Sequence, residues 1–130
     1  MRLTIFTDGA CKGNPGPAAI GAVLFDSQNA ILLEISKAIG NSTNNKAEYR
    51  AIIEALTAAK RLKADEVVVY LDSELVVKQL TRQYKVRSSE ILPLYLVAAD
   101  LLQSFPKNSV KHIGRSLNQR ADALANKAFE

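Results

Sequence analysis

The sequence predicts an α/β protein built on a five-stranded mixed sheet with helices on both faces. Two apolar segments, residues 18–25 and 30–39, are separated only by the polar turn sequence DSQN, which is typical of an antiparallel hairpin. Farther along the chain, segments with helical spacing alternate with short apolar runs, which indicates crossover connections between parallel strands. We therefore expect three antiparallel strands followed by two parallel ones.

The first half of the chain is expected to form three strands and one long helix. A strand at residues 2–7 (RLTIFT) precedes the Gly- and Pro-rich turn sequence TDGACKGNPGP, and strands at 18–25 and 30–39 follow it. Residues 44–62 are predicted to be helical, with Asn and Thr available as N-caps. Helical spacing is shown there by the apolar residues Tyr49, Ile52, Ile53 and Leu56.

The second half is expected to add two strands and three helices. The β-branched run EVVVYL at 66–71 is typical of a central strand covered on both faces. The remaining elements are, in order, a helix at 74–80 capped by Ser73, a loop at 82–88, a helix at 89–103 with Pro93 in its first turn, a strand at 109–113, and a C-terminal helix preceded by a Ser116–Gln119 capping box.

Composition indicates one globular domain over residues 1–130. Hydrophobic residues make up 48% and charged residues 23%, which is close to the average for such proteins. No apolar stretch is long enough to span a bilayer, and the N-terminus becomes polar too early for a signal peptide. The single cysteine, Cys11, excludes an internal disulfide and suits a reducing compartment, so we expect a cytoplasmic protein.

The net charge of +4 permits binding to a polyanion without requiring it. A basic cluster at residues 60–63 has the ordinary interpretation of a solvated helix end, where cations suit the helix dipole. A second basic set surrounds a short loop instead: Lys78, Arg82, Lys85 and Arg87.

Two acids, Asp8 and Asp72, each follow a predicted strand. In open α/β sheets, functional groups gather beyond the carboxyl ends of the strands. If these two strands are parallel neighbours about 4.8 Å apart, the two carboxylates lie side by side, where repulsion calls for a cation between them. Each acid alone is equally well explained as a turn former or a helix cap.

Two further acids have positions compatible with the same site. Glu48 shares a helical face with Ile52, which directs its stem toward the sheet, and Asp122 lies in the first turn of the last helix, beside its apolar stripe. Four converging carboxylates would suit Mg²⁺ or Mn²⁺, whereas zinc normally requires His or Cys, of which only His112 and Cys11 are present. Two such ions can promote phosphoryl transfer without a covalent nucleophile.

The charge balance agrees with a nucleic-acid substrate. Setting those four aside from the 13 acidic residues leaves nine against 17 basic ones, a basic body around an acidic cleft.

Four sequence blocks occur together in the order and spacing of type 1 ribonuclease H: TDGACKGNPGP, TNNKAEYRA, YLDSELVVKQL and GRSLNQRADALANKA. The chain resembles this family from Leu3 to Ala128. The resemblance implies a ribonuclease H-like fold and an endoribonuclease that cleaves the RNA strand of RNA–DNA hybrids. It also implies two Mg²⁺ or Mn²⁺ ions per active site and products with 5′-phosphate and 3′-hydroxyl ends.

By this resemblance the catalytic acids are Asp8, Glu48, Asp72 and Asp122. Asp8 and Asp72 would bridge both ions, Glu48 would hold the ion near the leaving group, and Asp122 would hold the ion that activates water. The turn after Asp8 would both fix this carboxylate and let the backbone approach the RNA. Substrate contacts are implied for Cys11, Gly13, Asn14, Thr43, Asn44, Asn45 and Glu74, with Thr43 near a DNA phosphate.

The sequence departs from the family pattern at three places. Many relatives have Gln where Glu74 stands, and an ionised carboxylate can accept but not donate a hydrogen bond to a 2′-hydroxyl. Arg115 fits the place of the mobile His that assists product release in many bacterial members, while His112 is assigned a structural role. Residues 82–88 are too short for the basic protrusion of some relatives, so weaker, salt-dependent hybrid binding is expected.

Two alternatives remain open at this stage. One is a noncatalytic hybrid- or RNA-binding module of the same fold, and the other is a nuclease acting on double-stranded RNA. A P-loop nucleotide binder is excluded because no Gly-Lys-Ser/Thr follows the glycine turn. We expect a monomer whose partner is the RNA–DNA hybrid, with no membrane contact and no small-molecule cofactor.

Overall fold

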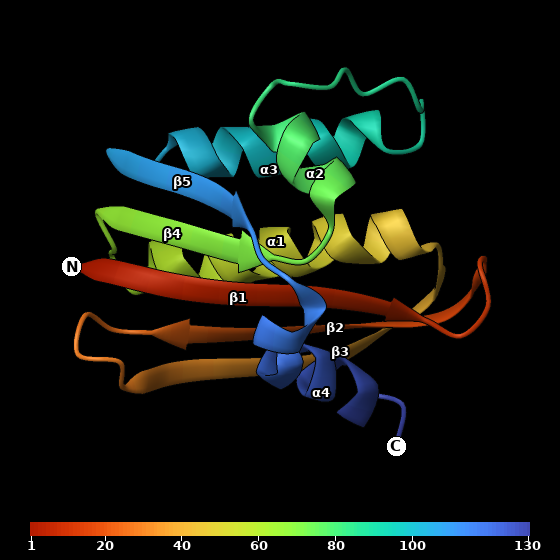
Figure 1. Cartoon of the computed structure of the whole chain (residues 1–130), viewed down its shortest axis with the longest axis horizontal. Coiled ribbons are helices and arrows are strands. Elements are labelled where there is room, and N and C mark those ends of the chain that lie inside the picture. Colours follow the sequence, from red (N-terminus) through yellow and green to blue (C-terminus); the bar gives the residue numbers. More distant parts are fainter.

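The computed structural model describes residues 1–130 and has the predicted order of elements (Figure 1). The strands are β1 (Arg2–Cys11), β2 (Gly16–Phe25), β3 (Ile31–Ser42), β4 (Glu66–Leu71) and β5 (Lys107–His112). The helices are α1 (Asn44–Arg61), α2 (Glu74–Leu80), α3 (Leu92–Gln103) and α4 (Gln119–Lys127), with a short 3₁₀ turn at Arg115–Leu117.

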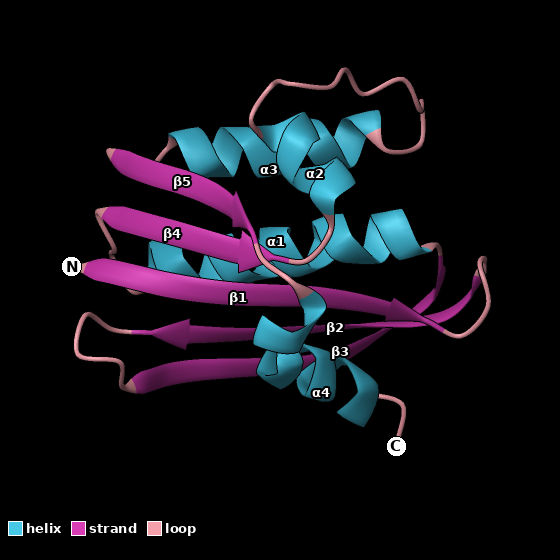
Figure 2. Cartoon of the chain, viewed as in Figure 1, coloured by secondary structure: helices cyan, strands magenta, loops and turns pink.

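The five strands form one mixed sheet in the order β3-β2-β1-β4-β5. The pairs β1–β2 and β2–β3 are antiparallel, whereas β1–β4 and β4–β5 are parallel, as predicted. Helix α1 packs on one face of the sheet together with α3, and α4 lies on the opposite face, over β1, β2 and β3 (Figure 2). The parallel strands β1 and β4 therefore lie at the centre, and each has its carboxyl end at the same edge.

The main core lies between the sheet and the pair α1 and α3. Apolar residues at alternate positions of β1 and β4 point into it, as do the apolar residues of α1 at helical spacing. Tyr49 of α1 is fully buried there, and its hydroxyl donates a 2.6 Å hydrogen bond to Gln79 of α2. This packing holds the first turn of α1 against the centre of the sheet.

Strand β1 is longer than the sequence pattern indicates. It continues through Asp8 to Cys11, because Asp8 pairs with Gly21 and Cys11 pairs with Ala18 of β2. The predicted end of this strand at residue 7 is therefore wrong, and Asp8 lies within the strand rather than in the turn. The Asp-Gly dipeptide resembles a hairpin signal, but here the second strand extends far enough to pair with it.

Helix boundaries differ from the expectations at two places. Helix α3 begins at Leu92 rather than at residue 89, because the Ser88 hydroxyl accepts backbone hydrogen bonds from Glu90 and Ile91 in a local turn before it. The predicted Ser116–Gln119 capping box is wrong: Ser116 lies within the 3₁₀ turn, and the N-cap of α4 is Asn118. The Ser73 cap of α2 is confirmed, since its hydroxyl accepts from the Val76 amide at 3.3 Å.

No helix combines the length and the apolar composition that a membrane crossing requires.

Candidate active site

Asp8 and Asp72 come from neighbouring parallel strands. The last paired residues of β1 and β4 are Phe6 and Tyr70, and each acid lies two residues farther along its chain. The side-by-side placement expected from the sequence follows directly from this register. Asp8 is buried, with 6% of its surface exposed, and Asp72 is half-buried.

Glu48 joins them from the first turns of α1, and Gly9 makes this approach possible. A Cβ atom at Gly9 would lie 2.5 Å from both the Ala47 carbonyl carbon and the Glu48 nitrogen. Only glycine lets the helix backbone come this close to β1 immediately beside Asp8. Glu48 is 9% exposed, and its Oε2 atom is buried without any hydrogen-bond partner.

These three carboxylates form a cluster that fits a divalent cation. One oxygen from each of Asp8, Glu48 and Asp72 lies within 4.8 Å of the others. Burial and the neighbouring Asp72 charge raise the pKa of Asp8 to about 7. Burial and the Asp8 charge raise the pKa of Glu48 well above its ordinary value. A cation would relieve this repulsion and use the unpartnered Glu48 oxygen, and an all-oxygen donor set suits hard ions.

Asp122 reaches the same cavity from the other face of the sheet. It lies in the first turn of α4, and this helix is held close to β2 at Gly21, the residue that pairs with Asp8. A Cβ atom at Gly21 would collide with the backbone of Ala121 and Ala125. Asp122 is not among the three acids whose oxygens cluster within 4.8 Å. The structure thus brings the four predicted acids to one cavity but only three of them into a common ligand set.

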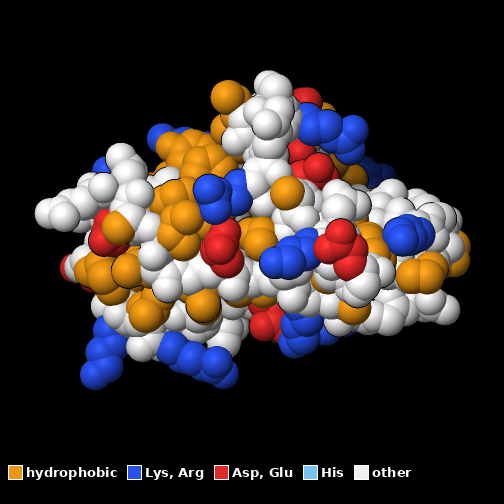
Figure 3. Space-filling model, turned by 90° about the horizontal axis from the view of Figure 1, so that it is seen from below, with side chains coloured by type: hydrophobic (Ala, Val, Ile, Leu, Met, Phe, Trp, Pro, Cys, Tyr) orange, Lys and Arg blue, Asp and Glu red, His pale blue; other side chains and the backbone are white.

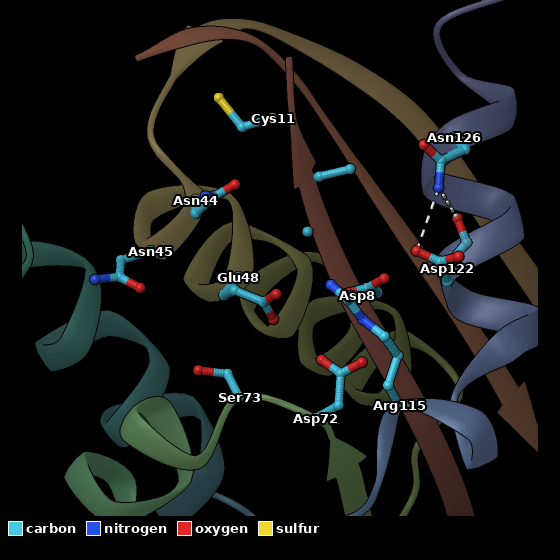
Figure 4. Close-up of a pocket in the computed structure, with 12 residues that line it drawn as sticks. Asp8, Cys11, Asn44, Asn45, Glu48, Asp72, Ser73, Arg115, Asp122 and Asn126 are labelled. Atoms are coloured by element: carbon cyan, nitrogen blue, oxygen red, sulfur yellow. Dashed lines mark hydrogen bonds between the residues drawn. The ribbon is translucent and has the colours of Figure 1, made fainter. Parts of the chain in front are cut away.

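The cavity has a volume of about 520 Å³ and a predominantly polar lining. The side chain of Arg115 points toward Asp8 in this cavity (Figure 4), and Asn44 and Asn45 line it from the start of α1. Its lining residues are Asp8, Gly9, Ala10, Cys11, Asn44, Asn45, Glu48, Asp72, Ser73, Arg115, Asp122 and Asn126.

Other residues that the sequence singled out lie outside this cavity. Asn14 and Thr43 line an adjoining cavity of about 400 Å³. There the side-chain oxygen of Asn14 accepts a hydrogen bond from the backbone N–H of Asn44 at 3.0 Å. Gly13 lies in the β1–β2 turn with a positive φ of 86° and lines neither cavity. Glu74 also lines neither; its carboxylate pairs with Lys78 at 2.7 Å, which lowers the pKa of Glu74.

His112 is exposed at the end of β5, and its charge also lowers the pKa of Glu74. Its predicted place at the end of this strand is confirmed by its pairing with Leu71 of β4, although its side chain does not pack in the interior.

Two residues at or beside the site were not predicted from the sequence. Asn126 donates to Asp122 Oδ1 at 3.2 Å, and its position four residues later on the same helix face is a signal that could have identified it. Asn118 is buried and donates to the Thr7 carbonyl at 2.9 Å, which ties the start of α4 to β1 next to Asp8. That contact joins residues far apart in sequence, and no local pattern indicates it.

Comparison with known proteins places the chain in one family. The family described as Reverse transcriptase-like matches residues 6–128. Ribonuclease HI of Halobacterium salinarum is 43% identical over 99% of this chain and 65% of its own length. Ribonuclease H of Polaromonas naphthalenivorans is 39% identical over the whole chain and 88% of its own length. The chain spans 36% of the length of a bifunctional protein of Mycobacterium tuberculosis, to which it is 41% identical.

Solved structures agree. The crystal structure of RNase H1 from Halobacterium salinarum superposes with a TM-score of 0.96 at 43% identity, covering 99% of this chain and 98% of that one. LC11-RNase H1, solved in complex with an RNA/DNA hybrid, gives a TM-score of 0.90 at 40% identity and covers 97% of this chain and 95% of that one. The predicted ribonuclease H-like fold is confirmed, and the chain belongs to the ribonuclease HI (type 1 ribonuclease H) family.

Proposed function

We propose that this protein is an endoribonuclease that hydrolyses the RNA strand of RNA–DNA hybrids and leaves 5′-phosphate and 3′-hydroxyl ends. The observation that carries the proposal is the cluster of Asp8, Glu48 and Asp72, whose oxygens lie within 4.8 Å of one another. The chain's membership of the ribonuclease HI family supports the proposed reaction. A relative solved in complex with an RNA/DNA hybrid supports the proposed substrate. A noncatalytic binding module would gain nothing from keeping mutually repelling buried carboxylates.

The proposed cofactors are two Mg²⁺ or Mn²⁺ ions held by Asp8, Glu48, Asp72 and Asp122. Such ions, when bound, stabilise the charge on the attacking and leaving oxygens of a phosphoryl transfer. Asp8 and Asp72 would contact both ions, while Glu48 and Asp122 would each hold one. The protein contributes rigid placement, because Asp8 and Glu48 are buried and Asp72 directly follows a central strand.

Substrate recognition is proposed for polar groups around the carboxylates. Asn44 and Asn45 present amides that can both donate to and accept from a 2′-hydroxyl, and the Cys11 backbone borders the same cavity. Asn14 and Thr43 would contact the backbone of the hybrid from the adjoining cavity. Gly13 would allow the turn to approach the RNA, and Glu74 would accept from a 2′-hydroxyl.

Arg115 is proposed to assist departure of the product phosphate from the cavity. Its guanidinium remains protonated throughout the ordinary pH range, so it attracts an anion but cannot exchange a proton as histidine does. Residue 115 should therefore contribute no step to the pH profile of cleavage near the ordinary histidine pKa of about 6.5. The shape of the profile in this pH range should be the same in the wild type and in an Arg115→Ala variant.

We further propose that residues 1–130 act as a single catalytic domain, as a monomer and in the cytoplasm. The single cysteine, Cys11, is free and suits a reducing compartment.

The test is cleavage of matched substrates: RNA–DNA hybrid, duplex RNA, duplex DNA and single-stranded RNA, each with Mg²⁺, Mn²⁺ or EDTA. We expect the wild type to cut only the RNA strand of the hybrid, and EDTA or Asp8→Asn to abolish cutting. Hybrid binding without cleavage would support a binding module instead. Cleavage of duplex RNA alone would indicate a different nuclease on the same fold.

A further inference from the structure

Asp122 is less constrained than Asp8 and Glu48. Asp8 and Glu48 are buried in the sheet and the helix that hold them, whereas Asp122 is half-buried in the first turn of α4. Its carboxylate carries the same charge as the nearby cluster. Repulsion from that cluster favours side-chain rotamers that point to solvent, so something must hold the carboxylate at the cavity.

The backbone of α4 is already fixed at several points. Gly21 lets the helix pack directly on β2, the Asn118 amide donates to the Thr7 carbonyl at 2.9 Å, and the Ser36 hydroxyl donates to the Leu124 carbonyl at 2.6 Å. The remaining freedom at Asp122 is therefore rotation about its own side-chain bonds.

Asn126 restricts this rotation. Its Nδ2 atom lies 2.9 Å from the Asp122 carbonyl oxygen and 3.2 Å from Asp122 Oδ1, so one amide contacts both the backbone and the carboxylate of the same residue (Figure 4). Asn126 also lines the cavity with the four acids. Its amide is neutral, so it supplies a hydrogen bond without adding a positive charge that would repel a cation.

We propose that Asn126 is a positioning residue for Asp122, which holds the carboxylate at the cavity in the orientation that binds a divalent cation. This inference rests on the proposed function, since it deepens the part assigned there to Asp122. Hydrogen bonds to ligating carboxylates orient the ligand, and their loss typically lowers metal affinity or activity by about 10- to 100-fold.

Asn126→Ala tests the proposal without threatening the fold. Alanine has the highest helix propensity, so the variant should keep its helix and its melting temperature in EDTA. The first readout is the Mn²⁺ concentration that produces half of the metal-induced rise in melting temperature, measured without substrate. The second is the Mg²⁺ concentration for half-maximal cleavage of the hybrid. We expect both concentrations to rise about 10-fold.

Gln119→Ala is the matched control, because Gln119 is an exposed amide on the same helix and lies outside the cavity. Its two midpoints should stay within about twofold of the wild type. Values for Asn126→Ala within twofold of this control would overturn the proposal.

A double-mutant cycle with Asp122→Ala shows whether Asn126 acts through Asp122. In the Asp122→Ala background, adding Asn126→Ala should not move the Mn²⁺ midpoint further, whereas a general effect on the helix would persist. A full additional shift would overturn the proposal. Failure of the proposed function is distinguishable, because it would appear as a wild-type protein that neither cleaves hybrid nor gains stability from Mn²⁺.

Discussion

At the scale of single residues, the cavity brings together negative charges on side chains that are partly or almost wholly removed from water. Asp8 is 6% exposed and Glu48 is 9% exposed; burial and the Asp72 charge raise the pKa of Asp8, and burial and the Asp8 charge raise the pKa of Glu48. Such an arrangement opposes folding of the metal-free protein at neutral pH, because removing charge from water and placing like charges together are both unfavourable. The cluster therefore lowers the free energy of unfolding of the metal-free protein, and it provides the ligands for a cation.

The stability of the metal-free protein should fall as the pH rises. Because burial raises the pKa of Asp8 from 3.8 to about 7, folded Asp8 keeps a proton that the unfolded chain has already lost. This stabilisation is complete below about pH 4 and is lost as the pH rises through about 7. Between pH 5 and 8 we expect the group to lower the free energy of unfolding by about 2–3 kcal/mol, measured by urea denaturation in EDTA. Asp8→Asn should flatten this dependence, and an unchanged slope in that variant would contradict the assignment.

Glu74 should limit the affinity for the hybrid. The ammonium of Lys78 lies 2.7 Å from its carboxylate and lowers the pKa of Glu74, so the residue is ionised and only accepts hydrogen bonds. Glu74→Gln releases Lys78 for phosphate and supplies a donor, so we expect hybrid binding to tighten about two- to fivefold, measured by fluorescence anisotropy in Ca²⁺. Glu66→Gln is the control, since Glu66 pairs with Arg2 at the opposite end of β4, and equal tightening there would reject a specific effect.

At the scale of elements, two close contacts between a helix backbone and a strand backbone place Glu48 and Asp122 at the cavity. Gly9 admits α1 on one face of the sheet and Gly21 admits α4 on the other; Gly9 follows Asp8 in β1, and Gly21 is the residue of β2 that pairs with Asp8. The positions of Glu48 and Asp122 thus depend on residues with no side chain at all.

Gly9→Ala should separate α1 from β1. The added Cβ would lie 2.5 Å from main-chain atoms of Ala47 and Glu48, which cannot move independently of the helix. We expect the free energy of unfolding to fall by about 1–3 kcal/mol and hybrid cleavage to fall at least about 10-fold as Glu48 shifts. The control is Gly114→Ala, where a Cβ meets no atom within 4 Å. A Gly9→Ala enzyme with wild-type stability and rate would show that this contact is unimportant.

The loop between α2 and α3 places a negative charge in the cavity whose residues Asn14 and Thr43 are proposed to contact the backbone of the hybrid. Glu90 lies 3.3 Å from Lys46, and both line the cavity that contains Asn14 and Thr43. An incoming phosphate must compete with Glu90 for this lysine. We expect Glu90→Gln to tighten hybrid binding about two- to fourfold at low salt, with the difference shrinking at high salt. Glu54→Gln, which breaks an equivalent pair with Lys37 outside that cavity, should leave affinity unchanged.

At the scale of the whole molecule, basic side chains are interspersed with acidic ones on the face that Figure 3 shows. On the face seen from below in Figure 3, Lys and Arg side chains alternate with Asp and Glu and with apolar side chains, and they form no continuous basic surface. Ion pairs such as Arg120–Glu34, at 2.9 Å, neutralise part of the positive charge. In the basic set around the loop after α2, Lys78 is likewise paired with Glu74.

Binding of the hybrid should accordingly depend strongly on salt but involve few phosphates. We expect the dissociation constant to rise about 10- to 100-fold between 50 and 200 mM KCl, the slope for roughly two to four phosphate contacts. Fluorescence anisotropy with a labelled hybrid in Ca²⁺ measures this slope directly. Near-independence from salt would exclude phosphate contacts as the main source of affinity.

Local sequence patterns determined the order of elements, the class of fold and the identity of the four acids. Hydrophobic periodicity and turn residues act over a few neighbours, so they identify α1 and β4 and the Ser73 cap without knowledge of the rest of the chain. They also show that Asp8 and Asp72 follow apolar runs. Boundaries were less accurate where a distant partner decides them, as for β1, which continues past Asp8 because β2 pairs with it.

Only the tertiary structure decided the geometry of the site. It placed Asp8, Glu48 and Asp72 in one ligand set and left Asp122 outside it, linked to Asn126. It also showed that Glu90 lies 3.3 Å from Lys46, and that the N-cap of α4 is Asn118 rather than the predicted Ser116. Distances between groups on different elements depend on strand register and on how closely backbones pack, and those are set by contacts between residues far apart along the chain.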